Sequence, residues 1–443
     1  MKSRNMCDLA AVTAMLALVS PLVFAAPQIS QATSQSFEQG GTLIIQGSGF
    51  VRESPDSYAV MFDMVEKAYI NGEINTHHDS FDELDPVQRI SEDPDTLWWK
   101  PSKSTTEANQ TPSVVRLLEG RSFYDGAFYQ LKGYNSFLGW PSAYGGSETP
   151  VDNTKLYVAW HLKMSYDPRY YWTVSPQSQE GSFVTGEEVV INGSEGRFIG
   201  IGTAGISDGM LHFEIPGHRN ANDLMGREIV GQSSGATSVF PDEFARGTGV
   251  GYETPGSNKY LRVWEDPNGK EGIRISWTQM TVHDEWKAAP VTPGQWHLME
   301  FMLDTDANRL MAYTDRKLVA EVVLDDQDAV AGKWSPTIAL LGFNGKIQEF
   351  QETRIDDIYM DKSFSRVVIG RKSQFSDLDS YELQYPMNWS SDQIEVKLNF
   401  GSIDPKTQSY LYVIDETGSV NEKGFPLCDE CGVPPEKVKL EIN

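Results

Sequence analysis

The sequence has little cysteine and little positive charge. Three cysteines among 443 residues exclude a small scaffold held together by disulfides. The chain carries 37 basic and 62 acidic side chains, for a formal net charge of −25 at pH 7. Because an excess of carboxylates repels phosphate groups, this charge argues against nucleic acid and anionic membrane surfaces as partners.

Long helical runs and long apolar runs are also scarce. Stretches rich in Ala, Leu, Glu and Lys are few, whereas 38 glycines, 23 prolines and 11% aromatic residues are spread along the chain. Such a composition is typical of many short strands joined by turns. Beyond the N-terminal segment, no apolar run approaches the roughly 20 residues that span a bilayer. We therefore expect an all-β fold without membrane insertion.

The first 25 residues have the pattern of a secretory signal peptide. Lys2 and Arg4 precede an apolar run over residues 9–24, and small residues follow at Ala25 and Ala26. A basic start, a short apolar core and a small-residue exit are read by the export machinery and then removed. We expect residues 1–25 to be cleaved and the mature protein to be secreted, cell-surface or periplasmic.

The C-terminal tail, residues 428–443, contains Cys428 and Cys431 in the sequence Cys-Asp-Glu-Cys. In an oxidising compartment this spacing favours a local disulfide. A thioredoxin-like redox motif would need a βαβ context, and a zinc site would need a second pair of ligands. Neither accompanies the pair, so the disulfide between Cys428 and Cys431 is the prediction.

Alternating polarity predicts several strands. Residues 156–164 place Leu, Val, Trp, Leu and Met on one face, and Tyr157, His161 and Lys163 on the other, because successive side chains of a strand point in opposite directions. Residues 260–264 and 273–277 flank an Asp-Pro-Asn-Gly turn and predict a hairpin. Three further runs, at 296–303, 309–313 and 318–324, predict an antiparallel meander.

The pattern from 294 to 361 carries a resemblance to a known family. Gly-Gln-Trp-His at 294–297, the meander that follows it, and Ile-Asp-Asp-Ile-Tyr-Met-Asp at 355–361 resemble the concanavalin A-like jelly roll of lectins, glucanases and several polysaccharide lyases. The resemblance covers roughly Tyr58 to Lys372. It implies two stacked antiparallel sheets whose concave face holds glycan. It also leaves a structural calcium ion open, since several such families bind one.

The N-terminal segment resembles the opening of an immunoglobulin-like domain of the IPT/TIG type. The resemblance is carried by Gly-Gly-Thr at 40–42 and a strand that ends in Gly-Ser-Gly-Phe at 47–50. The closing strands are missing after Phe50, and candidates for them lie at 389–398 and 410–418. A lone hairpin cannot bury a core. We therefore expect residues 42–46 to pair with strands between 394 and 414.

These patterns predict a jelly-roll β-sandwich inserted into, or flanked by, an immunoglobulin-like β-sandwich. The predicted parts, after the signal peptide and before the tail, are residues 26–55 and 373–427 for the split immunoglobulin-like domain and 56–372 for the concanavalin A-like sandwich. Insertion at a loop is the tolerated way to join domains in this manner.

Three short motifs match functional signatures in letters but not in context. Residues 200–205 match G-x-G-x-x-G, yet a strand-like run follows where a nucleotide-binding helix is needed. Residues 231–235 match the G-x-S-x-G nucleophile elbow, but β-branched residues and a proline follow. The acidic segment 304–308 has Arg309 at the glycine position of a calcium loop. We therefore predict a hairpin at 200–205, a surface turn at 231–235 and a hairpin turn at 304–308.

The sequence identifies no catalytic residues. The histidines have no metal-ligand spacing, so no metal ligand is predicted. The paired carboxylates of glucanases and the motifs of alginate lyases are also missing from the sequence.

Two strand faces carry the candidate binding site. Aromatic rings stack on sugars, and Arg, Lys or His donate to hydroxyl or carboxylate groups. The candidate carbohydrate-binding residues are Tyr157, His161, Lys163, Tyr260, Arg262 and Trp264. They favour an exported, lectin-like protein that binds an extracellular polysaccharide. A divergent polysaccharide lyase or glycoside hydrolase is the alternative, because the same groups include a Tyr or His base and an Arg that neutralises a carboxylate. A structural or adhesive surface protein is the further alternative.

Overall fold

The computed structural model describes residues 25–52, 59–63, 67–70, 73–75, 113–115, 121, 127–129, 136–137, 154–167, 170–202, 209–217, 223–241, 259–264, 274–278, 291–323, 337–344 and 352–427. The regular elements of these residues are strands, apart from one short 3-10 helix, η9 (Phe375–Asp377). The strands pair antiparallel throughout the four sheets. The all-β prediction is confirmed.

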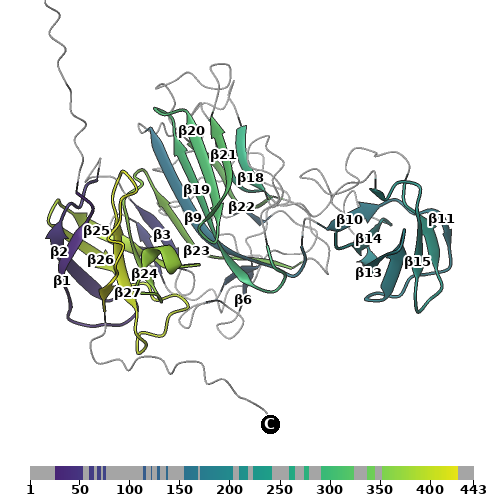
Figure 1. Cartoon of the computed structure of the whole chain (residues 1–443), viewed down its shortest axis with the longest axis horizontal. Coiled ribbons are helices and arrows are strands. Elements are labelled where there is room, and N and C mark those ends of the chain that lie inside the picture. The colour runs from purple at the N-terminus through teal and green to yellow at the C-terminus, as the bar shows by residue number, and fades with distance from the viewer. Residues whose placement is uncertain are drawn as a thin grey trace, which may run out of the picture.

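Strands from both ends of the chain form one sheet, which we call the terminal unit. Its strand order is β1-β2-β26-β25-β24-β27-β28. The bounds are β1 (Gln28–Ser34), β2 (Thr42–Ser48), β24 (Arg366–Gly370), β25 (Glu382–Trp389), β26 (Gln393–Lys397), β27 (Tyr410–Ile414) and β28 (Phe425–Pro426). Figure 1 shows the purple N-terminal strands beside the yellow C-terminal ones.

The predicted pairing of the two chain ends is confirmed. Residues Thr42 to Gln46 of β2 pair with Lys397 to Gln393 of β26. Leu43 and Ile45 of β2 are buried in one apolar cluster with residues of β24, β26 and β27. The two halves of this sheet therefore pack against each other as a sandwich. Its immunoglobulin-like character stays a prediction.

One boundary differs from the sequence prediction. The range 56–372 was expected to belong to the central sandwich, but β24 at 366–370 pairs with β25 and β27 of the terminal unit. The strand before it, β23 (Thr353–Asp361), belongs to the central sheet. Both strands are largely buried, and the alternation pattern of a strand does not determine which sheet the strand will join.

The central body contains a sheet of ten strands. Its main order is β21-β20-β19-β9-β23-β3-β4-β5, with β7 beside β23 and β6 beside β7. The bounds are β3 (Val60–Asp63), β4 (Lys67–Ile70), β5 (Glu73–Asn75), β6 (Ser113–Val115), β7 (Ala127–Tyr129), β9 (Lys155–Met164), β19 (Trp296–Asp304), β20 (Arg309–Thr314), β21 (Lys317–Val323) and β23. The predicted meander is confirmed as β19, β20 and β21.

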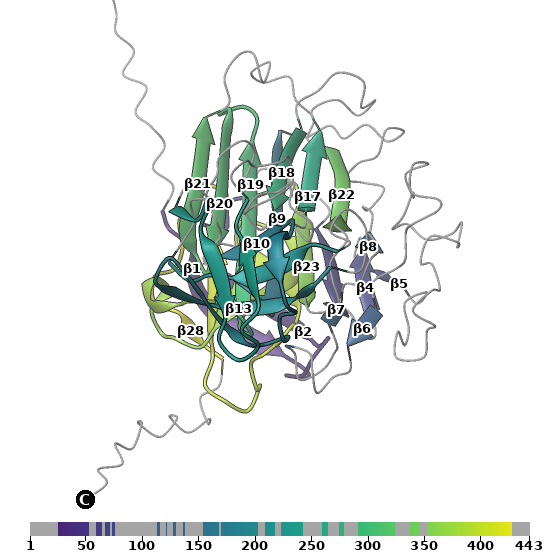
Figure 2. The same ribbon diagram turned by 90° about the vertical axis from the view of Figure 1, so that its right-hand side faces the viewer.

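A four-stranded sheet lies on the side of this sheet away from the terminal unit (Figures 1 and 2). Its order is β18-β17-β22-β8. The bounds are β8 (Ser136–Phe137), β17 (Lys259–Trp264), β18 (Arg274–Thr278) and β22 (Thr337–Asn344). β17 pairs antiparallel with β18, which confirms the predicted hairpin.

A third body interrupts the central sandwich, and the sequence did not reveal it. Seven strands in the order β10-β14-β13-β12-β15-β16-β11 form a sheet of their own, set to the right in Figure 1. We call it the inserted unit. The bounds are β10 (Tyr171–Val174), β11 (Gln177–Glu180), β12 (Glu188–Ile191), β13 (Ser194–Ile201), β14 (Leu211–Glu214), β15 (Glu228–Gly231) and β16 (Thr237–Val239).

The inserted unit has its own core. Trp172, Phe198 and Phe213 belong to an apolar cluster whose members all come from residues 172–240. A separate core of this kind identifies a separate folding unit. The sequence prediction had placed this segment within the concanavalin A-like sandwich, because its strands alternate in the same manner.

The terminal unit packs on one face of the ten-stranded sheet. One buried cluster joins Ala159 and Leu298 of the sheet to Leu383 and Tyr412 of the terminal unit. Among the residues that the structure describes, no helix is long and apolar enough to cross a membrane.

Candidate functional site

The six predicted binding residues lie on two sheets. The first triplet is on β9 of the ten-stranded sheet and the second is on β17 of the four-stranded sheet: Tyr157, His161 and Lys163, then Tyr260, Arg262 and Trp264. The two triplets therefore do not share a sheet face. The side chains of the β17 triplet lie outside the described residues, so their role stays a prediction.

Tyr157 lies beneath the terminal unit rather than on an open surface. Its side chain is fully buried, and its hydroxyl donates to Glu300 Oε1 at 2.8 Å. The hydroxyl of Tyr381, the residue before β25, donates to the same oxygen. Burial, and then the charge of Glu300, raise the pKa of Tyr157 well above its ordinary value. A tyrosine base needs the opposite shift, so this environment favours a structural role.

Arg366 completes this group. Its guanidinium lies 4.8 Å from the centroid of the Tyr157 ring, and Nη2 lies 3.6 Å from Glu300 Oε1. The buried carboxylate is thus neutralised by a cation and hydrogen-bonded by two hydroxyl groups, as a buried charge requires. The group joins the sheet to the terminal unit.

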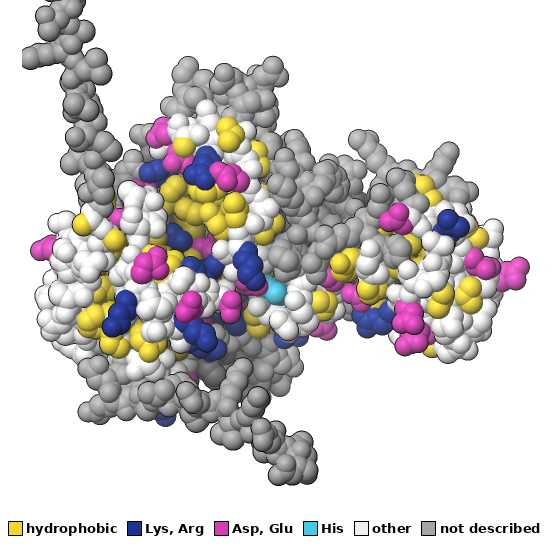
Figure 3. All heavy atoms as spheres, viewed as in Figure 1, with side chains coloured by type: hydrophobic (Ala, Val, Ile, Leu, Met, Phe, Trp, Pro, Cys, Tyr) yellow, Lys and Arg dark blue, Asp and Glu magenta, His cyan; other side chains and the backbone are white. Residues whose placement is uncertain are grey.

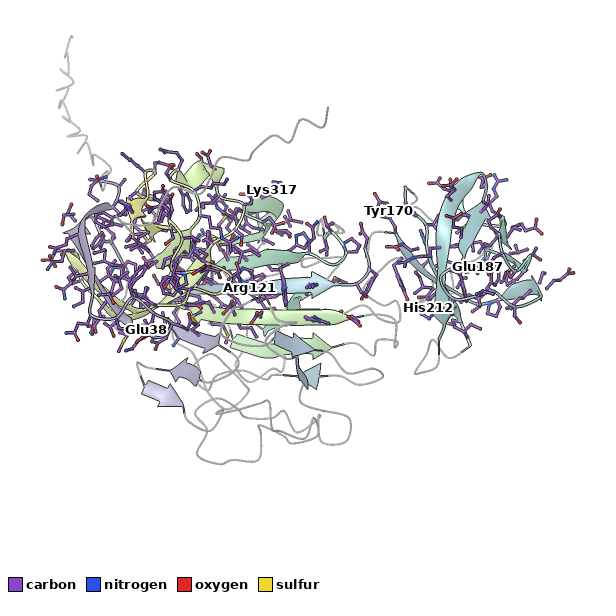
Figure 4. All side chains as sticks on the ribbon, turned by 90° about the horizontal axis from the view of Figure 1, so that it is seen from below. Glu38, Arg121, Tyr170, Glu187, His212 and Lys317 are labelled. Carbon is purple, nitrogen blue, oxygen red and sulfur yellow. The ribbon has the colours of Figure 1, made fainter. Side chains whose placement is uncertain are left out.

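His161, the second predicted residue of β9, lies in a buried ionic cluster with Arg121, Asp357 and Glu382. His161 and the two acidic residues are at most 3% exposed. Arg121 Nη1 and Nη2 donate to the two carboxylate oxygens of Glu382 at 2.7 and 2.8 Å, and Nη2 also pairs with Asp357 Oδ2. Figure 4 labels Arg121 where the sheet meets the terminal unit.

The charges of this cluster are set by burial and by Arg121. Burial, and then the positive charge of Arg121, lower the pKa of His161 to about 3. Burial raises the pKa of Glu382, but the charge and hydrogen bonds of Arg121 outweigh it and bring the pKa to about 2. At neutral pH, His161 is therefore neutral and Glu382 is ionised. One imidazole and two carboxylates are also a donor set that can hold a metal ion.

Lys163 is the member of the β9 triplet that is partly exposed. Its ammonium group lies 5.9 Å from the centroid of the Trp296 ring, which is a cation–π contact. This pair lies where β9 and β19 meet, since Lys163 and Trp296 are register partners.

Part of the same sheet face remains uncovered. Met302 is the register partner of Tyr157, so the two side chains share a face, and the face continues across β20 and β21. Its residues include Leu318 and Val323, which are 50% and 75% exposed, and the half-buried Met302, Met311 and Tyr313. Met302 lies at the edge of this region, since it also packs against the cluster shared with the terminal unit. We call these five residues the open sheet face. In Figure 3 hydrophobic side chains gather over β19–β21, with charged groups at their upper edge.

The G-x-S-x-G motif forms a surface turn, as predicted, and this turn binds the carboxylate of Glu187. Glu187 accepts hydrogen bonds from the backbone N–H and the hydroxyl of both Ser233 and Ser234, and from Val184 N–H. A Cβ on Gly231 would lie 2.8 Å from both carboxylate oxygens, so the first glycine permits this approach. Neither serine hydroxyl is free to act as a nucleophile.

The other two motifs are hairpins, as predicted. β13, which contains Gly200, pairs antiparallel with β14, whereas a dinucleotide-binding unit requires parallel strands. The acidic segment turns from β19 into β20, and Asp304 Oδ1 accepts from Ala307 N–H at 2.9 Å.

A His–Asp pair near this hairpin also has a structural explanation. His297 Nδ1 lies 2.7 Å from Asp315 Oδ2. Its other nitrogen, Nε2, accepts from the backbone N–H of Thr292 at 2.9 Å, so Nδ1 carries the proton and donates to Asp315. Both ring nitrogens therefore hold turns in place, and neither can serve as a general base.

Sequence reasoning missed most of the ionic cluster. Arg121, Asp357 and Glu382 are distant from His161 in the chain, and no local spacing marks them. Cys428 and Cys431 lie outside the described residues, so the disulfide between them stays a prediction.

Comparison with known proteins gives weak matches only. No protein-family model matches the chain, and no curated protein matches it. Among solved structures, a mutant of the alginate lyase Aly36B in complex with alginate tetrasaccharide is 10% identical, with a TM-score of 0.20, over 53% of this chain and 79% of that chain. An alginate lyase of polysaccharide lyase family 7 is 6% identical, with a TM-score of 0.20, over 53% and 78%. A botulinum neurotoxin type C structure is 6% identical, with a TM-score of 0.17, over 48% and 33%.

Proposed function

We propose that this chain is an exported, lectin-like protein that binds an extracellular polysaccharide on the open sheet face. The observation that carries the proposal is an uncovered patch of methionine, aromatic and aliphatic side chains on the face that continues from Tyr157. The predicted binding face is thereby divided. The terminal unit buries its Tyr157 and His161 end, and the end on β20 and β21 stays open.

The chemistry of the open sheet face suits a sugar chain. The Tyr313 ring offers an apolar surface and a hydroxyl, a combination that stacks on the apolar side of a sugar. Arg309 and Glu321, which form an ion pair on the same face at 2.6 Å, are both well exposed. They supply donors and acceptors for sugar hydroxyls at the edge of the patch.

The burial of the two candidate bases, Tyr157 and His161, favours binding over catalysis. Tyr157 and His161 are buried under the terminal unit, and the pKa of Tyr157 is raised by burial. A polysaccharide cannot reach either group in this arrangement. The lyase or hydrolase alternative would need a site among other residues, and the adhesive alternative would need no glycan at all.

A glycan-array screen of the mature protein, with and without calcium, tests the proposal. For the best glycan, Tyr313→Ala should weaken binding by roughly tenfold or more, since stacking on a ring adds about 0.5–1.5 kcal/mol to the area it buries. Val184→Ala is the matched control, because Val184 is 56% exposed in the inserted unit. It should leave the affinity unchanged.

Three outcomes would contradict parts of the proposal. Absence of any glycan hit favours the adhesive alternative, and new unsaturated or reducing ends on a bound glycan favour the enzyme. Loss of affinity in Arg262→Ala or Trp264→Ala, with Tyr313→Ala unaffected, would move the site to the four-stranded sheet.

A further inference from the structure

Three potential metal ligands meet at the contact between the ten-stranded sheet and the terminal unit. His161 comes from β9, Asp357 from β23 and Glu382 from β25, and one ligand atom of each lies within 4.8 Å of the others. All three are at most 3% exposed. Three separate strands thus direct donor groups to one buried point.

Asp357 is held there in an unfavourable backbone conformation. Its φ is +46°, in the left-handed region that non-glycine residues rarely adopt. It lies where the register between β23 and β9 shifts, between Asp356 and Tyr359. Asn399 Nδ2 donates to Asp357 Oδ1 at 3.3 Å, which leaves Oδ2 as the oxygen that lies 4.0 Å from His161 Nδ1. Strain of this kind concentrates at functional sites.

His161 presents an unused donor atom to this point. Its Nδ1 is buried and has no hydrogen-bond partner among the described residues. Its Nε2 lies 3.5 Å from Ser380 Oγ, which can accept a hydrogen bond from the Nε2–H group. With the proton on Nε2, the lone pair of Nδ1 points toward the carboxylates. Metal-binding histidines are oriented in the same manner, by a hydrogen bond from the second ring nitrogen.

Arg121 currently supplies the positive charge. Among the described contacts, its Nη2 is the partner of both Glu382 Oε2 and Asp357 Oδ2. Glu382 Oε1 additionally accepts from the N–H and the hydroxyl of Ser402, at 3.1 and 2.8 Å, and would stay fixed if Arg121 moved. Withdrawal of one guanidinium nitrogen would therefore free one oxygen on each carboxylate.

We propose that His161, Asp357 and Glu382 form a site for a divalent transition-metal cation, which exchanges with the Arg121 guanidinium. The exchange replaces the single positive charge of the guanidinium with the two positive charges of the cation, so the buried carboxylates stay compensated in both states. One imidazole and two carboxylates suit Zn²⁺ or Mn²⁺. Ca²⁺ takes oxygen ligands and is disfavoured by the imidazole. The site is independent of the open sheet face and of any glycan.

Calorimetric titration of the chelator-treated mature protein with Zn²⁺ or Mn²⁺ tests the proposal. We expect one ion per chain in the wild type. His161→Gln should weaken its binding at least tenfold, whereas Arg121→Gln should strengthen it, because the competing cation is gone. Glu188→Gln is the control, since Glu188 is an exposed carboxylate of the inserted unit. It should change nothing.

The opposite effects expected at His161 and Arg121 separate this site from adventitious binding to an acidic surface. Equal affinities in wild type, His161→Gln and Arg121→Gln would overturn the proposal, as would the absence of binding in both the wild type and Arg121→Gln. If a variant does not fold, anomalous scattering from zinc-soaked wild-type crystals decides. A peak at coordination distance from His161 Nδ1 supports the site, and peaks confined to surface carboxylates refute it.

Discussion

Replacement of Glu187 by glutamine should unfold the inserted unit at markedly lower temperature. Five donors converge on the carboxylate, with Val184 N–H and Ser234 hydroxyl on Oε1 and three groups of Ser233 and Ser234 on Oε2. Glutamine keeps one acceptor oxygen and turns an amide N–H₂ group toward the remaining donors. With the amide at the Oε1 position, the Val184 N–H loses its acceptor, while the Ser234 hydroxyl can rotate.

The expected magnitude follows from these contacts. A fully buried donor left unsatisfied costs about 1–3 kcal/mol, and the remaining hydrogen bonds lose their charge-assisted part. Because the Val184 and serine contacts with Glu187 are only part-buried, we expect a loss at the low end, about 1–2 kcal/mol, which corresponds to a roughly 5- to 30-fold change in an opening equilibrium. For a unit of about 70 residues, the transition should fall by about 4–16 °C.

Hydrogen exchange in the full-length chain, followed on peptides from β12 and β15, measures this change locally. Glu188→Gln is the matched control, because Glu188 is the exposed neighbour of Glu187 on β12. Similar exchange in the two variants would refute the reasoning.

The pH dependence provides a second test of the same interaction. Burial raises the pKa of Glu187, but the hydrogen bonds from Ser234, Val184 and Ser233 outweigh it and lower the pKa from 4.5 to about 2. A folded-state pKa below the unfolded value gives stability that is present above pH 4.5 and lost as the pH falls toward 2. The difference between wild type and Glu187→Gln should therefore shrink across this window. A difference that stays constant would contradict the assignment.

Three further changes probe the terminal unit. Ile45→Ala should destabilise it by about 2–5 kcal/mol, because Ile45 is fully buried in the core shared by both chain ends. Deletion of residues 27–50 should reduce amide protection in β26 more than in β19. Equal losses of protection in the two strands would contradict the split arrangement. Tyr381→Phe should cost about 1–3 kcal/mol in thermal unfolding, since it removes a donor from buried Glu300, and a Tyr410→Phe control of equal effect would argue against that role.

The strand pattern of the sequence determined the fold class and much of the pairing. Alternation at 156–164 fixes which side chains share a face, because the period of a strand is two. The hairpin of β17 and β18 and the meander of β19 to β21 follow from short turns that only antiparallel neighbours can use. The pairing of β2 with β26 was predictable for another reason, since an isolated hairpin has no core.

Only the tertiary structure decided what covers each face. The pattern of β9 placed Tyr157 and His161 together, but it could not show that Leu383 and Tyr412 of the terminal unit would cover that face. The inserted unit was missed for the same reason. Alternating polarity predicts a strand, but it does not determine which hydrophobic core the strand packs into.

The ionic cluster is the clearest case. Arg121, His161, Asp357 and Glu382 meet although they come from segments that are far apart in the chain. Local physical chemistry sets the direction of each side chain along its own strand, whereas sheet order and domain packing decide which charges share a buried volume. In this protein the sequence determined the strands and their faces, and the packing of the terminal unit on the ten-stranded sheet decided where the candidate sites lie.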